Sequence, residues 1–165
     1  MSVAAEPTTE AITIEHQQEP ARPDLLAHER VQRVLLADDD VDLLRVLLQR
    51  VTAGRSGPQH GTQYEVHTAL SGDVALQLAM SLHFDVLLLD VQMPGLSGVE
   101  VTRAIRRQQE LWQPAIVLIS AFADAQGPQE ALQAGADAVV HKPFTLATLR
   151  EGIQQASRRR TRCTR

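Results

Sequence analysis

The sequence has few aromatic residues and a single cysteine. Aromatic side chains make up 3% of the 165 residues, so leucine, valine, isoleucine and alanine must supply the core. The one cysteine, Cys163, excludes a disulfide within the chain, and its place in an arginine-rich segment gives it no evident role. A chain of this length has room for one domain with a substantial core.

Three kinds of segment are also missing. No apolar run approaches the roughly 20 residues that cross a membrane. The first residues are polar and acidic, unlike a secretory signal peptide. No glycine-rich phosphate-binding loop, of the P-loop or of the dinucleotide type, follows a predicted strand. These absences predict a cytoplasmic protein and argue against the common nucleotide-binding folds.

Charge is distributed unevenly along the chain. The formal net charge is −4, but residues 158–165, RRRTRCTR, hold five arginines and no acid, which leaves −9 on residues 1–157. An acidic body disfavours general nucleic-acid binding. We interpret the basic segment as a solvated tail, and docking to an acidic partner or to nucleic acid is the alternative.

The composition divides the chain into three parts. Residues 1–32 form a leader with three prolines in its first 23 residues and little apolar surface, which predicts disorder. A short helix over Asp24–Gln32 is the alternative there. Residues 33–157 carry the regular apolar patterns of a domain, and residues 158–165 are the basic tail.

Five segments of the domain are predicted to be strands. Three are continuous apolar runs, which is typical of strands buried on both faces of a parallel sheet. A fourth is shorter and more polar, and a fifth consists of a valine pair. In chain order the five are Val34–Ala37, Tyr64–Ala69, Val86–Leu89, Ala115–Ile119 and Val139–Val140.

Helical apolar spacing follows every predicted strand. The expected inward positions are Val41, Leu44, Leu48 and Val51; Ala75, Leu78, Ala79 and Leu82 after a Ser71 cap; Val101 and Ile105 in a helix from Gly98 to about Gln109; and Leu146, Leu149 and Ile153. A weaker helix begins near Gly127-Pro128 and ends at Gly135. This alternation predicts an α/β fold, a doubly wound five-stranded parallel sheet with helices on both faces.

Chemically active residues stand where the predicted strands end. Asp38 and Asp39 follow the first strand, Asp90 the third, Ser120 the fourth and Lys142 the fifth. A single strand-end aspartate is more often a helix cap, but the carboxyl ends of parallel strands meet at one edge. Clustered carboxylates repel unless a cation neutralises them, and all-oxygen ligands favour Mg²⁺. Carboxylate, metal, hydroxyl and lysine together suit an acceptor of a phosphoryl group.

These motifs resemble the receiver domain of two-component response regulators. They are the acidic triplet at Asp38–Asp40, the D-x-x-M-P-G-x-x-G pattern over Asp90–Gly98, Ser120, and Lys142-Pro143-Phe144. Each is weak alone, but the four occur in order at the expected strand ends. The resemblance runs from about Arg33 to Ser157. It implies a flavodoxin-like fold with strand order 2-1-3-4-5, which places the aspartates at the topological switch point.

The resemblance implies a role for each site residue. Asp90 would accept a phosphoryl group from a histidine kinase. Asp39, Asp90 and the main-chain carbonyl of Gln92 would bind Mg²⁺ directly, and Asp38 would act through a metal-bound water. Ser120 would donate a hydrogen bond to a phosphoryl oxygen. Lys142 would pair with Asp90 and then with the phosphate, and its bond to Pro143 would be cis.

Two features differ from the family pattern or tune it. The residue three before the lysine is usually aromatic and changes rotamer during the switch, whereas here it is Val139, which is too short to do so. Gln92 and Phe122 take the positions that flank the path of hydrolytic water. We hypothesise that Phe122 shields the acyl phosphate and lengthens its life, so that Phe122→Glu would speed dephosphorylation.

The resemblance also implies partners and leaves alternatives. The partners would be a sensor histidine kinase or a histidine phosphotransfer protein and a downstream protein target, with neither membrane nor nucleic acid involved. The protein would be a stand-alone receiver that assists its own phosphorylation and is otherwise no enzyme. Its docking face would lie over residues 124–157, and a phosphorylation-dependent dimer is one further expectation.

A pseudo-receiver that binds partners without being phosphorylated is the main alternative, because a fold does not entail a function. A phosphatase with an aspartate nucleophile is a weaker one. Such enzymes need a second aspartate two residues after the first, where this chain has Gln92.

Overall fold

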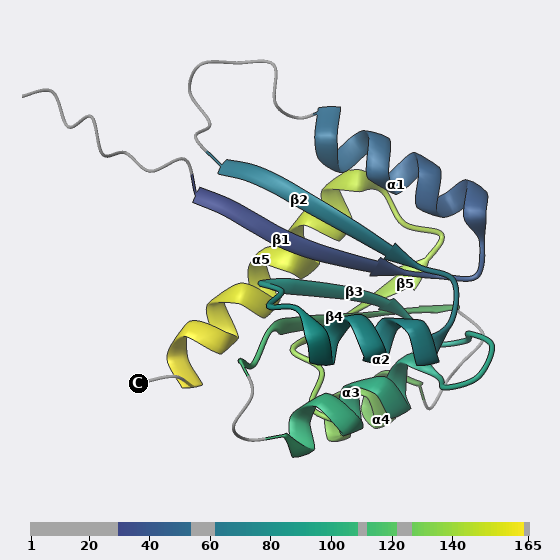
Figure 1. The fold of residues 1–165 in the computed structure, drawn as a ribbon, viewed down its shortest axis with the longest axis vertical. Coiled ribbons are helices and arrows are strands. Elements are labelled where there is room, and N and C mark those ends of the chain that lie inside the picture. The colour runs from purple at the N-terminus through teal and green to yellow at the C-terminus, as the bar shows by residue number, and fades with distance from the viewer. Residues whose placement is uncertain (1–29, 54–61, 109–111, 122–126, 164–165) are drawn as a thin grey trace, which may run out of the picture.

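A parallel sheet forms the centre of the molecule. The computed structural model describes residues 30–53, 62–108, 112–121 and 127–163. Within them five parallel strands take the order β2-β1-β3-β4-β5, with a helix after each strand (Figure 1). The elements are β1 (Arg30–Ala37), α1 (Val41–Ala53), β2 (Thr62–Ala69), α2 (Gly72–Ser81), β3 (Val86–Asp90), α3 (Gly98–Arg107), β4 (Ala115–Ala121), α4 (Gly127–Gln133), β5 (Ala138–Lys142) and α5 (Leu146–Cys163). The flavodoxin-like order predicted from the sequence is confirmed.

The sheet separates two hydrophobic cores. Successive side chains of a strand point to opposite faces, so residues in register form stripes across the sheet. Leu35, Leu87 and Ile116 contribute to the core that includes residues of α2, α3 and α4. Leu36 and Leu88 contribute to the other core, which includes residues of α1 and α5. Helices cover both faces, which explains why β3 is apolar from Val86 to Leu89 and β4 from Ala115 to Ile119.

Helix α1 presents a different face to the sheet from the one expected. Leu44 and Leu47 are buried against it, whereas Val41 and Leu48 are 43% and 37% exposed. Apolar residues occur around much of this helix, so spacing alone did not fix its rotation about its own axis. The prediction for Val51 concerns a side chain outside the described part of the chain.

The inward positions of the other helices agree better with the prediction. Val101 and Ile105 of α3 and Leu149 of α5 are buried. In α2, Ala75 is buried, but Leu82 is 38% exposed because it is the extended residue that ends the helix. Among the remaining expected positions, those packed against the cores are Leu78, Ala79 and Ile153.

Gly135 ends α4, as its position in the sequence predicts. Its φ is +100°, a left-handed conformation that favours glycine. The Gly135 amide donates to Leu132 O at 3.0 Å, and the Ala136 amide donates to Ala131 O at 3.1 Å. These two bonds are the pair that defines a Schellman motif.

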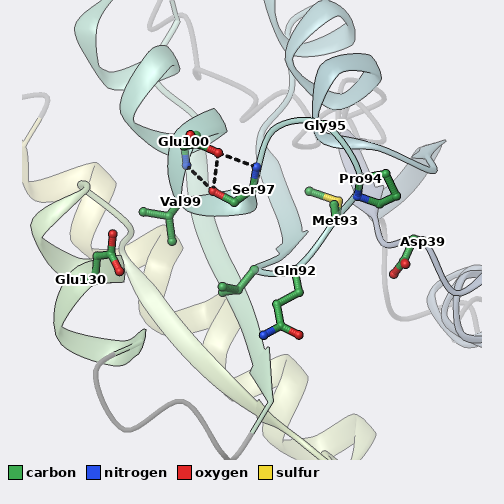
Figure 2. Close-up of a pocket in the computed structure, with 10 residues that line it drawn as sticks. Asp39, Gln92, Met93, Pro94, Gly95, Ser97, Val99, Glu100 and Glu130 are labelled. Carbon is green, nitrogen blue, oxygen red and sulfur yellow. Dashed lines mark hydrogen bonds between the residues drawn. The ribbon is translucent and has the colours of Figure 1, made fainter.

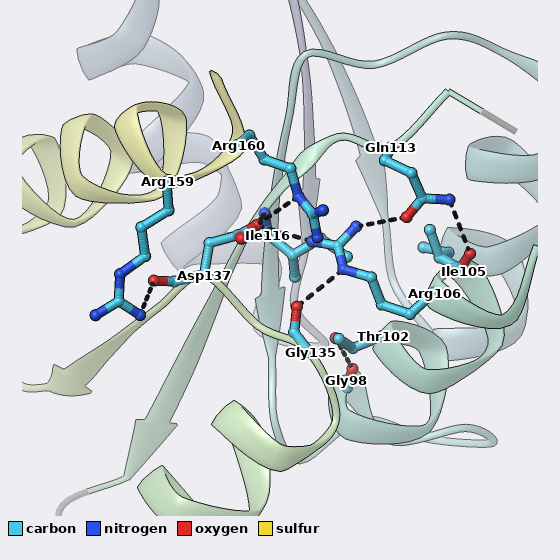
Figure 3. A network of polar contacts seen from close by, with 10 residues as sticks. All are labelled: Gly98, Thr102, Ile105, Arg106, Gln113, Ile116, Gly135, Asp137, Arg159 and Arg160. Atoms are coloured by element: carbon cyan, nitrogen blue, oxygen red, sulfur yellow. Dashed lines mark hydrogen bonds and ion pairs between the residues drawn. The ribbon is translucent and has the colours of Figure 1, made fainter. Parts of the chain in front are cut away.

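A buried carboxylate organises the edge of the sheet where β4 and β5 begin (Figure 3). Asp137 Oδ2 accepts hydrogen bonds from the Ile116 amide at 2.9 Å, from Arg106 Nη2 at 2.8 Å and from Arg160 Nε at 3.3 Å. Arg106 also donates from Nε to Gly135 O at 2.9 Å. The network therefore joins α3, β4, the α4–β5 connection and the end of α5.

The ends of the described domain differ from the boundaries expected. Residues 30–32 belong to β1 and not to a helix, and the rest of the expected segment from Asp24 lies outside the described residues. Helix α5 continues past Ser157 to Cys163, so most of the basic tail is helical. Among the described helices, none has the length and apolar character needed to cross a membrane.

Candidate functional site

Three chain segments bring charged side chains to the carboxyl edge of the sheet. Asp38 follows β1, Asp90 is the last residue of β3, and Lys142 is the last residue of β5. The strands run parallel, with Ala37 beside Leu89, so their ends lie along one edge. Asp38 and Asp90 are buried there, at 2% and 5% exposure. Two acids buried this deeply require a compensating charge.

Lys142 supplies that charge. Its Nζ lies 2.7 Å from Asp38 Oδ2 and 2.6 Å from Asp90 Oδ1, so one ammonium group bridges two carboxylates. The lysine side chain is 30% exposed. The cation therefore remains in contact with solvent while both of its partners are enclosed.

Backbone amides hold the second oxygen of each carboxylate. The Gln92 amide donates to Asp90 Oδ2 at 2.8 Å, and the Asp40 amide donates to Asp38 Oδ1 at 2.9 Å. Asp40 in turn accepts bonds from the amides of Asp42 and Leu43, and so caps α1. Two residues of the acidic triplet therefore have different roles. Asp38 faces the site, and Asp40 caps helix α1.

Burial and the lysine act in opposite directions on Asp90. Desolvation raises the pKa of Asp90 above its ordinary value, and the hydrogen bond and charge of Lys142 offset only part of this rise. Burial alone would lower the pKa of Lys142, but its hydrogen bonds to Asp38 and Asp90 outweigh that effect and raise the pKa. Lys142 is therefore cationic at neutral pH.

Ser120 lies close to the site but is not part of the ion-pair network. It is fully buried on β4, in register with His141 of β5. Its Oγ donates to the main-chain carbonyl of Ala121 at 3.2 Å. The hydroxyl is thus held at the end of the strand that separates β3 from β5.

Asp39 and Gln92 line an open pocket beside the ion pairs. Figure 2 shows it between the loop that follows β3 and helix α4. Its volume is about 580 Å³. Within the described part of the chain, the Asp39 carboxylate makes no hydrogen bond or ion pair. The same holds for the main-chain carbonyl of Gln92. Both oxygen groups therefore remain available to a ligand.

The metal set expected from the sequence is only partly assembled. Among the described residues, no group of three or more histidine, cysteine or acidic side chains is arranged to hold a metal ion. Asp38 and Asp90 share Lys142 as their cation, at 2.7 and 2.6 Å. The donors nevertheless fit Mg²⁺ in kind, because Asp39, Asp90 and the Gln92 carbonyl offer oxygen atoms only.

The pocket also contains residues that the sequence reasoning did not single out. Ser97 and Glu100 form a capping box at the start of α3, with Ser97 Oγ accepting from the Glu100 amide at 3.2 Å. Glu130 of α4 lies on the wall and pairs with Arg103 at 3.0 Å. The S-x-x-E spacing after the Met-Pro-Gly turn is a readable signal for the first pair.

The expectations for Val139 and Phe122 have different outcomes. Val139 is partly buried and packs against the core that α2, α3 and α4 cover, as a short apolar side chain should. Phe122 and its proposed shielding role lie outside the described residues. The Lys142–Pro143 bond is cis, as expected.

Comparison with known families decides the assignment. The family model of the response regulator receiver domain matches residues 34–154, most of the chain. The chain belongs to this family. A receiver domain is a phosphoacceptor signalling unit of two-component systems and not an enzyme in the usual sense.

Individual proteins related to this receiver domain share about a third of the aligned residues with it. Regulatory protein AtoC of Escherichia coli (strain K12) is 32% identical over 126 residues, which are 76% of this chain and 25% of that protein. Response regulator ArlR of Staphylococcus aureus is 31% identical over 127 residues, 77% of this chain and 53% of that protein. The receiver therefore spans a quarter to about half of the length of these relatives.

Solved structures show the same fold. The chemotaxis response regulator CheY4 of Vibrio cholerae superposes with a TM-score of 0.65 at 28% identity, covering 76% of this chain and 98% of that one. TrrA of Thermotoga maritima, solved in complex with Mg²⁺ and BeF, gives 0.59 at 30% identity, with coverage of 76% and 98%.

Proposed function

We propose that Asp90 accepts a phosphoryl group from a sensor histidine kinase or a histidine phosphotransfer protein. The observation that carries this proposal is the bridge from Lys142 to Asp38 and Asp90, at 2.7 and 2.6 Å. A buried acid at a strand end is kept next to a cation that is still partly exposed to solvent. Such an arrangement suits a carboxylate that must gain and lose a dianionic group.

In the proposed reaction Asp90 acts as the nucleophile. A carboxylate oxygen of Asp90 forms a bond to phosphorus while the bond from phosphorus to the donor histidine nitrogen breaks, and the imidazole leaves with the electron pair. The product is an acyl phosphate on Asp90. The Gln92 amide, which holds Asp90 Oδ2 at 2.8 Å, fixes the orientation of the carboxylate during the attack.

Lys142 and Ser120 stabilise the transferred group. The ammonium of Lys142 leaves Asp90 and pairs with a phosphoryl oxygen, keeping its bond to Asp38. Ser120 turns its hydroxyl from the Ala121 carbonyl, 3.2 Å away, toward the phosphoryl group. Each residue exchanges one oxygen partner for another, so the site needs little structural rearrangement.

Mg²⁺ completes the proposed site. Asp39, Asp90 and the Gln92 carbonyl would hold it, with Asp38 contributing through a water. When bound, Mg²⁺ neutralises charge on the incoming phosphoryl group. This assignment is supported by the position of Asp39 and Gln92, both of which line the pocket.

The signal would pass onward through protein contacts. We infer that the phosphorylated receiver docks to a downstream protein through α4, β5 and α5, within residues 124–157, or relays the phosphate to a phosphotransfer protein. Dimerisation on phosphorylation is a further route. The acidic charge of residues 1–157 favours protein partners over nucleic acid.

The test is intact-protein mass after incubation with acetyl phosphate, with and without Mg²⁺. The expected result is a Mg²⁺-dependent gain of one phosphoryl group that is absent in Asp90→Asn. Asp85→Asn is the matched control, since Asp85 lies just before β3 at the opposite edge, where its Oδ2 accepts from the Arg33 amide at 2.8 Å. That variant should still be phosphorylated.

A second candidate function is a scaffold that works without phosphorylation. The observation that favours it is Val139, a partly buried residue that packs against the core and cannot act as an aromatic switch. A folded wild-type protein that gains no mass with Mg²⁺ or Mn²⁺ would support the scaffold and overturn the phosphoacceptor proposal. Partners would then be sought for the unmodified form.

A further inference from the structure

The first turn of α2 lies against the turn that follows the phosphoacceptor strand. The Gly72 amide donates to the carbonyl of Pro94 at 3.2 Å, and Gly72 itself is buried. Helix α2 runs along the same face of the sheet as α3 (Figure 1). A segment far from the site in the sequence therefore contacts the loop of residues 91–97.

The contact at Gly72 leaves no room for a side chain. A Cβ atom there would lie 1.8 Å from Leu96 O and 2.6 Å from Leu96 C. Both are backbone atoms, which cannot turn aside as the end of a flexible side chain can. Any residue other than glycine would push the loop away from α2 or tilt the helix.

A second contact joins the same turn of α2 to the loop. Gly95 has a φ of +73°, and a Cβ added to it would lie 1.7 Å from Oδ2 of Asp73. The Asp73 carboxylate thus lies directly over the turn. Gly72 and Asp73 together form what we term the α2 clamp on the loop.

The clamped loop carries groups that the proposed site uses. At its start the Val91 amide donates to Ile119 O at 2.8 Å, and at its end the Gly98 amide donates to Val91 O at 3.2 Å. Between these anchors lies Gln92, whose amide orients Asp90 and whose carbonyl is a proposed Mg²⁺ ligand. The path of the middle of the loop, where α2 touches it, decides where these groups lie.

We propose that Gly72 is a positioning residue for the phosphoacceptor site. It acts through the loop and touches neither Asp90 nor a ligand. The inference rests on the proposed function, because the effect it predicts is on Mg²⁺ binding and phosphoryl acceptance. Displacing the loop weakens Mg²⁺ binding. It slows phosphoryl transfer to Asp90 much less once Mg²⁺ is saturating, because Asp90 and Lys142 stay in place on their strands.

The test compares Gly72→Ala with Gly135→Ala. The control adds a methyl group at a glycine near the opposite edge of the sheet, where Cβ would lie 2.8 Å from the side-chain atom Arg106 Cγ and where the φ of +100° also favours glycine. Both variants should lose stability, but only Gly72→Ala should weaken Mg²⁺ binding, by roughly tenfold, as is usual when the support of a metal ligand is removed. Calorimetric titration with Mg²⁺ measures the affinity. Hydrogen exchange of residues 91–97 without metal should become faster in Gly72→Ala alone.

A second pair of variants covers the case in which Gly72→Ala does not fold. Gly95→Ala changes an exposed turn whose φ of +73° favours glycine, and it places a Cβ atom 1.7 Å from Asp73 Oδ2, so it strains the loop and displaces it or the Asp73 carboxylate. If the clamp positions the loop, it should weaken Mg²⁺ binding, and Asp73→Ala in the same chain should restore part of the affinity. Without such rescue the clamp is not what positions the loop, and the proposal is overturned.

Failure of this inference can be told apart from failure of the proposed function. If wild type takes up phosphate but Gly72→Ala and Gly135→Ala do not differ in Mg²⁺ affinity or in exchange of residues 91–97, Gly72 is merely structural. If wild type takes up no phosphate, the phosphoacceptor proposal fails, while the exchange measurement still reports whether α2 holds the loop.

Discussion

Lys142 Nζ lies 2.6 Å from Asp90 Oδ1, although β4 separates the strands that carry the two residues. The lysine side chain therefore reaches across the end of β4, where Ser120 is buried. This arrangement places a cation, a buried carboxylate and a hydroxyl on three adjacent strands. The ionisation of Asp90 therefore depends on Lys142, a residue far from it in the sequence.

Replacing Lys142 with methionine should raise the pKa of Asp90 further. The lysine's hydrogen bond and charge are what oppose the effect of burial on this carboxyl group, and methionine keeps the length of the side chain without the charge. A carbon-13 NMR titration of the aspartate carboxyl groups measures the change. A pKa of Asp90 that stays the same or falls would show that the ion pair does not set its ionisation.

Replacing Asp90 with asparagine should stabilise the domain at neutral pH. Because the folded state raises the pKa of Asp90, the folded protein binds this proton more tightly than the unfolded chain does. The contribution of Asp90 to stability is thus most favourable below the unfolded value of 3.8 and is lost as the pH rises through the folded pKa.

The Asp90→Asn advantage in the free energy of unfolding should therefore be present at pH 7 and shrink as the pH falls toward 3.8. Urea unfolding of both proteins at several pH values measures it. An advantage that grows in acid would contradict the direction of the shift.

Removing the carboxylate of Asp137 should destabilise the domain strongly. Asp137→Ala leaves the guanidinium of Arg106, which is 13% exposed, without its acidic partner, and such losses cost about 3–5 kcal/mol. Asp42→Ala is the control, because its pair with Arg45 is exposed on both sides and should contribute less than about 1 kcal/mol. Urea unfolding measures the free energy of unfolding of both variants. Equal losses would show that the Asp137 network stabilises the domain no more than an exposed ion pair does.

Truncating the chain after Ser157 should weaken the domain, although the family match ends at residue 154. The lost segment contains Arg159, which donates to Asp137 O at 3.0 Å, and Arg160, which donates to Asp137 Oδ2 at 3.3 Å. Hydrogen bonds of this kind contribute about 1–3 kcal/mol in total here. Thermal unfolding of the shortened chain measures the loss of stability. An unchanged midpoint would instead support the prediction of a basic tail that makes no stabilising contact with the domain.

The prediction of the fold rested on features that are local in the chain. Runs such as Val86–Leu89 have no polar face, and only a strand covered on both sides can bury all of their residues. Helix signals such as the Ser71 cap and the glycine at 135 were likewise visible in short stretches of sequence and are confirmed. The strand order came from the resemblance of the strand-end motifs to a known family.

The sequence by itself determined which residues reach the carboxyl edge of the sheet, because parallel strands put their ends together whatever their packing. The tertiary structure alone decided what those residues do to one another. That Lys142 bridges Asp38 and Asp90, and that Leu47 replaces Leu48 in the core, depends on strand register and on helix rotation. The α2 clamp and the Asp137 network likewise join segments distant in the chain. Such contacts arise only when whole elements pack, so no local pattern of residues encodes them.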